Sequence, residues 1–294
     1  MKTNFEPPYA LALVLGLLAA CSDGDPTGSG GEGTAAFTTW GEEYIEQEIP
    51  EDPGDGTGFV DGWTVRFSKF LVSIGGIVVS NQAGESGGTH PGSKLFDNTV
   101  PGVKSVVEFP GIAARAWDRV SYEIAPVTDE TELDASASED DETLMLDGGY
   151  SLFASGTATK DGVEKTFAWG FTTATLYDEC SSEQDGREQE GLVVKNNART
   201  TAELTTHGDH FFYDRLQASP DATVPTSLRF DALAAADEDG DGEVTLEELD
   251  GTLIDVRLYD PSGLGAATYG EFVTALARTV GHFRGEGECT VSSP

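Results

Sequence analysis

Residues 237–248 carry oxygen-bearing side chains at the spacing that a hard cation needs. Ca²⁺ takes about six to eight oxygen ligands at about 2.3–2.6 Å, so its loop must aim alternate side chains inward while the chain turns sharply. Gly242 falls at the sixth position, where a Cβ would oppose that turn. The predicted calcium ligands are the side chains of Asp237, Asp239, Asp241, Thr245 and Glu248 and the backbone carbonyl of Glu243.

This loop resembles the calcium loop of the EF-hand family, and with its flanking segments the resemblance covers residues 227–253. It implies one helix before the loop and one after it. An apolar stripe at helical spacing precedes the loop, with Thr226 as the expected N-cap, and Asp250-Gly251 shortens the helix expected after it. The alternative is a solvated turn in an acidic chain. The stripe consists of Leu228, Phe230, Leu233 and Ala234.

A second segment, residues 260–271, has only part of the loop pattern, because Leu264 stands at its fifth position. Thr268 and Glu271 also have the spacing of a capping box, in which each side chain accepts a hydrogen bond from the other residue's backbone N–H at a helix start. We expect the helix cap, at most a degenerate partner loop, and one bound Ca²⁺. The residues that match the loop pattern are Asp260, Ser262, Gly265, Thr268 and Glu271.

A candidate transition-metal site lies in the run from His207 to His210, which also contains Asp209. On an uninterrupted strand His207 and Asp209 share one face and His210 lies on the other, so a bend at Gly208 is required to bring both histidines to one ion. His282 would approach the same region if a disulfide folds the C-terminal segment back. The alternative is a strand end whose aromatic neighbours pack into the core.

Residues 149–153, followed by residues 167–170 and Cys180, are similar to periplasmic copper-binding proteins associated with methanobactin operons. The similarity includes no set of metal ligands. It implies copper handling as an alternative function for this chain.

The N-terminus has the pattern of an export signal, with Lys2 before an apolar run that is too short for a bilayer span of about 20 residues. The sequence Leu18-Ala19-Ala20-Cys21 resembles the lipobox of bacterial lipoproteins, which implies a lipid anchor on Cys21. We expect a signal peptide over residues 1–20, then the lipidated cysteine and a flexible linker over residues 21–35. An ordinary signal peptide is the alternative.

The two other cysteines, Cys180 and Cys289, are expected to form a disulfide, because export exposes them to an oxidising compartment. Two unpaired thiols are the alternative. The bond would connect the C-terminal calcium module to the preceding domain.

Residues 36–225 show short alternating apolar segments separated by turn signals, which predicts an antiparallel β-sandwich or barrel. Lys160-Asp161-Gly162 is the strongest hairpin signal, and Gly75-Gly76 is expected to be a turn. The acidic stretches 129–143 and 178–190 are expected to be solvated loops. With a helical EF-hand module over residues 226–289, the predicted fold class is α+β.

The formal net charge of −35 disfavours nucleic acids and anionic lipids as partners. The sequence contains no nucleophile elbow, zinc-protease helix motif or phosphate-binding glycine loop. We therefore expect a non-enzymatic, lipid-anchored protein of the bacterial cell envelope, whose Ca²⁺ braces a β domain that binds a protein or glycan partner. The alternative is a periplasmic copper- or zinc-binding protein that uses His207, Asp209 and His210, and a hydrolase is a weaker alternative.

Overall fold

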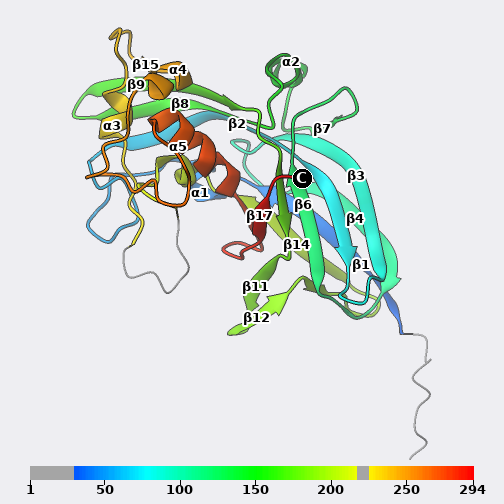
Figure 1. The fold of residues 1–294 in the computed structure, drawn as a ribbon. Helices are drawn as coiled ribbons and strands as arrows, with labels where there is room; N and C mark the ends of the chain where they lie inside the picture. The colour runs from blue at the N-terminus through cyan, green and yellow to red at the C-terminus, as the bar shows by residue number, and fades with distance from the viewer. Residues whose placement is uncertain (1–29, 217–224) are drawn as a thin grey trace, which may run out of the picture. The chain divides into compact units, whose positions relative to one another are not determined.

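The computed structural model describes residues 30–216 and 225–294 (Figure 1). The expected signal peptide, the Cys21 lipidation site and most of the linker lie outside the described residues. The chain from Gly31 to Pro294 forms one compact unit. Within the described ranges, the structure contains no helix with the length and apolar character needed to cross a membrane.

Strands make up 45% of the structure and helices 16%, which confirms the predicted β-rich chain. The strands are β1 Glu32–Trp40, β2 Thr64–Ser80, β3 Ser86–Asp97, β4 Lys104–Ala113, β5 Ala116–Trp117, β6 Arg119–Ile124, β7 Glu132–Leu133, β8 Leu152–Lys160, β9 Val163–Phe171, β10 Thr175–Asp178, β11 Ser181–Gln184, β12 Arg187–Glu190, β13 Leu192–Val193, β14 Arg199–Thr206, β15 Glu243–Val244, β16 Gly281–Phe283 and β17 Thr290–Ser292. The helices are α1 Glu42–Glu46, α2 Glu139–Gly148, α3 Asp231–Ala234, α4 Leu246–Gly251 and α5 Tyr269–Leu276, with 3₁₀ turns η1 Gly208–Phe212 and η2 Ala277–Thr279.

Two sheets contain most of the strands in the described residues. The smaller sheet has the order β16-β14-β1-β4, and the larger has the order β15-β9-β8-β2-β6-β10-β17, with β3 beside β2 and β7 beside β3. Most neighbouring strands are antiparallel, but β1 is parallel to β14, β3 to β7 and β9 to β15. In Figure 1, α3 and α4 lie near the end of the larger sheet that is formed by β8 and β9.

The hairpin predicted at residues 160–162 is confirmed, because β8 pairs with β9 from Lys160 and Val163 onward. Asp161 and Gly162 both have positive φ, at 50° and 80°, as a tight two-residue hairpin turn requires. The turn predicted at Gly75-Gly76 is wrong. β2 continues through both glycines with a register shift, and Gly76 takes φ 60°, so the pair forms a bulge within a strand.

The two acidic stretches expected to be loops contain regular structure. Ser138 and Asp141 form a capping box that starts α2, so part of residues 129–143 is helical. Residues 181–190 form the hairpin β11–β12, whose turn contains Asp185 at φ 53° and Gly186 at φ 75°. Both elements have signals in the sequence, a Ser-x-x-Asp cap and an Asp-Gly turn.

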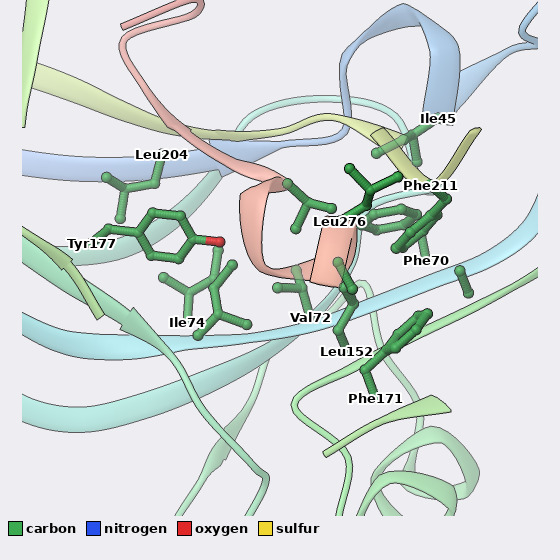
Figure 2. Close-up of a cluster of buried hydrophobic side chains, with 14 of the residues drawn as sticks. Ile45, Phe70, Val72, Ile74, Leu152, Phe171, Tyr177, Leu204, Phe211 and Leu276 are labelled. Carbon is green, nitrogen blue, oxygen red and sulfur yellow. The ribbon is translucent and has the colours of Figure 1, made fainter. Parts of the chain in front are cut away.

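One hydrophobic core joins the two sheets and the C-terminal helices. Figure 2 shows side chains from several elements converging, including Leu204 of the smaller sheet, Val72 of the larger sheet and Leu276 of α5. Residues after position 225 therefore share their core with the β-sheets.

The predicted disulfide is confirmed. Cys180 and Cys289 are bonded with an S–S distance of 2.08 Å and a sequence separation of 109. Cys180 is buried and follows β10, while Cys289 precedes β17, which pairs with β10. The bond thus fixes the C-terminal strand to the larger sheet.

An ion-pair network fixes α2 to the larger sheet. The ammonium group of Lys69 donates hydrogen bonds to Asp97 Oδ2 at 3.0 Å and to Asp141 Oδ2 at 2.9 Å, and both carboxylates are buried. Burial alone would raise the pKa of Asp141, but hydrogen bonds from Ser138 and Lys69 lower it below its ordinary value. Asp141 therefore adds stability above its unfolded pKa of about 3.9, and that stability is lost as the pH falls through the lower folded pKa.

Replacing Lys69 by methionine is expected to lower the free energy of unfolding by about 3 kcal/mol at pH 7, because two buried carboxylates lose their counter-ion. The loss should shrink below about pH 4, because protonation of Asp141 removes a charge that Lys69 neutralises. Urea denaturation at both pH values measures it. Lys94→Met is the control, since Lys94 pairs with the exposed Glu132 and its loss should change stability by less than about 1 kcal/mol. An equal loss at both pH values would contradict the role of the charges.

Two candidate metal sites

The histidine cluster lies at one edge of the smaller sheet. β1 and β14 are parallel neighbours, so the segments that follow them leave the sheet at the same edge. Glu42 opens α1 after β1, and His207 follows β14. β16 pairs antiparallel with β14 and places His282 opposite Thr205. The backbone N–H of His207 donates to the carbonyl of Val280 at 2.9 Å, which fixes β16 beside the cluster.

The bend that the histidine prediction required is present. β14 ends at Thr206, and the chain turns at once into η1, which begins at Gly208. A Cβ at Gly208 would lie 2.7 Å from Phe67 and 2.8 Å from Ile45, so glycine is the residue that allows this close approach. The bend brings His210 to the same side as His207.

Three histidines meet there. One ring nitrogen from each of His207, His210 and His282 lies within 4.8 Å of the other two. The ring centroids are 4.3 Å apart for His207 and His282, and 5.1 Å apart for His210 and His282. The residues are 7%, 2% and 3% exposed, so the group is almost closed to solvent. His210 Nδ1 and the hydroxyl of Thr279 are hydrogen-bonded at 2.8 Å, which fixes one ring.

Burial controls the protonation of the cluster. Burial, together with the rings of His282 and His207, lowers the pKa of His210 well below its ordinary value. Burial likewise lowers the pKa of His282 to about 3. Burial opposes charge on His207 too, but the carboxylate of Glu42 and more distant acidic groups raise its pKa above the ordinary value. At neutral pH His210 and His282 are therefore neutral, which is the form in which imidazole binds a metal.

Buried polar atoms at the cluster support a metal ion. Within the described residues, His282 Nδ1 and, on the residue next to His210, Asp209 Oδ1 are buried without a hydrogen-bond partner, while His207 Nε2 lies 3.3 Å from Glu42 Oε1. Leaving one such atom unpaired costs about 1–3 kcal/mol, so the unpaired nitrogen of His282 calls for a ligand or water. Imidazole nitrogens suit Zn²⁺, Cu²⁺ and related transition metals. The residues present fit such an ion.

The three-histidine group differs in one member from the set expected from sequence. Asp209 does not join it, and its Oδ2 accepts a hydrogen bond from the hydroxyl of Tyr213 at 2.9 Å. His282 takes the third place. The disulfide and the pairing of β16 with β14 bring His282 next to His207. This is the position expected for His282 if a disulfide folds the C-terminal segment back.

Glu42 lies beside the cluster in a strained conformation. Its Oε1 is 3.3 Å from His207 Nε2, and its backbone has φ 44°, in the left-handed region that non-glycine residues rarely adopt. Such a conformation costs about 1–3 kcal/mol and tends to occur at functional sites. No sequence pattern identified Glu42 as a candidate site residue.

The predicted calcium loop brings together three of its six predicted ligands. Carboxylate oxygens of Asp237, Asp239 and Glu248 lie within 4.8 Å of one another. Asp241 instead accepts a hydrogen bond from the backbone N–H of Glu243 at 2.8 Å. Thr245 donates to Glu248 Oε2 at 2.8 Å and forms with it the capping box of α4. Gly242 has φ 93°, the turn conformation expected at this position.

The loop is attached to the larger sheet. Val244 in β15 pairs with Phe167 of β9, and the indole N–H of Trp169 donates to the Val244 carbonyl at 2.8 Å. Lys165, also in β9, donates a hydrogen bond to Asp237. The eighth loop position thus pairs with a strand of the β-sheet, and one loop carboxylate has a lysine counter-ion.

The helices around the loop are shorter than the EF-hand resemblance implies. α3 begins at Asp231 and has four residues, because Leu228 forms bridges to Phe59 and Tyr213 in place of a helical turn. The N-cap expected at Thr226 is therefore wrong. α4 ends at Gly251, as the interruption at Asp250-Gly251 predicts.

The second loop-like segment starts a helix. Thr268 and Glu271 form the expected capping box, and α5 begins at Tyr269. Glu271 Oε2 accepts hydrogen bonds from the backbone N–H groups of Ala267 and Thr268. Asp260 accepts one from the backbone N–H of Ser262. The hydrogen bonds of Thr268 and Glu271 are therefore those of the expected helix cap.

Comparison of the chain with models of protein families, with curated proteins and with solved structures gives no match.

Proposed function

We propose that this protein binds a transition-metal ion, copper or zinc, through His207, His210 and His282. The observation that carries the proposal is the meeting of three buried imidazole nitrogens within 4.8 Å. Three nitrogen ligands leave a fourth position for water or another donor, as in tetrahedral zinc sites. The near-complete burial of the rings favours ion binding over catalysis.

We propose that the protein has this function outside the cytoplasm. A disulfide between Cys180 and Cys289 is stable in an oxidising compartment. It agrees with the export signal and lipid anchor proposed for residues 1–21. The core shared by the two sheets favours a sandwich as the scaffold of the site.

Titration of the purified protein with Zn²⁺ and Cu²⁺, after removal of bound metals, tests the proposal. We expect one tightly bound ion per chain, and nitrogen hyperfine structure in the electron paramagnetic resonance spectrum of the Cu²⁺ form. Weak binding of several ions, with oxygen-only spectra, would contradict a three-histidine site.

We further propose that residues 237–248 bind one structural Ca²⁺ in an EF-hand-like module. The grouping of Asp237, Asp239 and Glu248 supports this second site. Attachment of the loop to β9 by backbone pairing provides the rigidity that a partner EF-hand usually supplies. Because one ion has no cooperative partner, a structural brace fits better than a calcium sensor.

Calorimetry is expected to show one Ca²⁺ bound, with a Kd of about 10⁻⁴ to 10⁻³ M as in other extracellular modules. Asp237→Ala and Glu248→Gln should each weaken it by about tenfold or more, because each removes a negatively charged oxygen ligand. Ca²⁺ at 100 times its Kd should raise the free energy of unfolding by about 2.7 kcal/mol. Asp260→Asn in the second segment is the control and should bind Ca²⁺ like wild type. Equal Ca²⁺ binding by wild type and all three variants would contradict the proposed site.

A further inference from the structure

A second group of metal-binding side chains shares His207 with the three-histidine cluster. One ligand atom each from Glu42, His207 and Glu286 lies within 4.8 Å of the other two. The groups differ in exposure. Glu286 is exposed and Glu42 partly exposed, whereas His210 and His282 are buried. The five side chains therefore form a continuous series of ligands from solvent to the buried cluster, with His207 common to both groups.

We infer that Glu42, His207 and Glu286 form an outer metal position, through which an ion enters the three-histidine site. This inference rests on the function proposed for the inner site. It assigns the two carboxylates to the capture and transfer of the ion, and it predicts that they control the rate of loading more than the final affinity.

The fold holds both carboxylates toward His207 from separate chain segments. Glu42 stands at the start of α1 with a left-handed backbone, and its Oε1 lies 3.3 Å from His207 Nε2. Glu286 lies in a tight turn that is closed by a hydrogen bond from the Phe283 N–H to the Gly287 carbonyl at 2.9 Å. The hydroxyl of Thr205 donates to the carbonyl of Gly285 at 2.9 Å and ties this turn to β14.

The chemistry of the two positions suits a transfer. Carboxylate oxygens bind a hydrated divalent cation readily and with little selectivity, whereas three imidazoles favour a transition metal. As the ion moves inward, nitrogens of His210 and His282 replace the oxygens of Glu42 and Glu286. The ion keeps its charge, no electron is transferred, and both carboxylates remain as anions at the surface. His207 remains close enough to serve as a ligand at either position.

A different entrance is available for comparison. A cavity of about 220 Å³ is lined by His210, Thr279, His282 and Glu288, among others, and its lining includes neither Glu42 nor Glu286. Glu288 is the acidic residue of that cavity. It provides a matched carboxylate control on the competing route.

Stopped-flow measurement of Co²⁺ binding to the metal-free protein tests the inference through the visible absorbance of bound Co²⁺. In Glu42→Gln/Glu286→Gln, association should slow by about tenfold or more, since acidic capture sites raise on-rates by at least that factor. Dissociation should slow as well, because the ion leaves by the same route, so the Kd should change by less than about threefold. Glu288→Gln should load like wild type.

A trapped form provides the second measurement. His210→Ala/His282→Ala removes the inner site and should still bind one Co²⁺ more weakly. Addition of Glu42→Gln should abolish this binding.

Unchanged association in the Glu42/Glu286 variant, or slow loading in Glu288→Gln alone, would overturn the outer position while the inner site stands. Faster dissociation with a weaker Kd would show that the carboxylates only orient His207. If wild type binds no Co²⁺, the proposed function fails and the outer position fails with it.

Discussion

Replacing His282 by alanine is expected to weaken the binding of Zn²⁺ and Cu²⁺ by about 100-fold or more. The buried cluster offers three imidazole nitrogens as the proposed ligands, and even the loss of a supporting residue behind a metal ligand typically lowers affinity by about 10- to 100-fold. Removal of a ligand should exceed that effect. Competition with a chromophoric chelator of known affinity measures the change.

The control for this prediction is the fourth histidine. His90 lies in β3 of the larger sheet, outside the three-histidine group, so His90→Ala should keep the wild-type affinity. The Ca²⁺ binding proposed for residues 237–248 offers an independent test that the His282 variant is folded. If His282→Ala binds Ca²⁺ normally and still retains full affinity for Zn²⁺, the three-histidine assignment is wrong.

Local sequence patterns predicted the parts of the fold that local contacts determine. One of the alternating apolar segments within residues 36–225 contains Val120, Tyr122 and Ile124, which occupy three buried positions of β6. The Asp161-Gly162 turn corresponds to the β8–β9 hairpin. In each case the side-chain period or the turn conformation is set by neighbours in the chain.

The candidate metal sites depend on contacts that such patterns do not contain. His282 reaches His207 because β16 pairs with β14, and the segment between them includes more than 70 sequence positions. Lys165 pairs with Asp237 across a separation of 72 residues. The cysteine count gave the one long-range constraint that the sequence does show, and it correctly placed the C-terminal segment near the sheets.

The expected helix before the calcium loop shows how tertiary contacts override a local pattern. Leu228 and Phe230 belong to the apolar stripe that was expected to be helical, but Leu228 bridges to Phe59 while the ring of Phe230 packs edge-on against Phe59 and Trp63. Burial of these aromatic rings stabilises an extended segment where a short helix would gain little. The pattern indicated which residues are buried and not the backbone that buries them.

Removing the disulfide with Cys180→Ala/Cys289→Ala is expected to lower the free energy of unfolding by about 4–5 kcal/mol. The bond closes a segment with a sequence separation of 109, and in the chain-entropy model a loop of about 100 residues contributes about 4.7 kcal/mol. Alanine is the suitable replacement because Cys180 is buried, where a serine hydroxyl would need a hydrogen-bond partner. The urea midpoint of the variant, compared with wild type under non-reducing conditions, measures the loss.

The same bond should also support the histidine cluster. Cys289 lies just after the segment that carries His282 and Glu286, and the backbone N–H of Ser181 donates to the carbonyl of Glu288 at 2.8 Å beside the bond. Without the disulfide this segment retains its pairing with β14 and β10 but loses its covalent attachment. Affinity for Zn²⁺ should therefore fall in the variant even where it is fully folded, whereas Ca²⁺ affinity should stay unchanged because the loop is attached to β9. An unchanged urea midpoint would show that the bond adds no stability, and a parallel loss of both metals would indicate general unfolding.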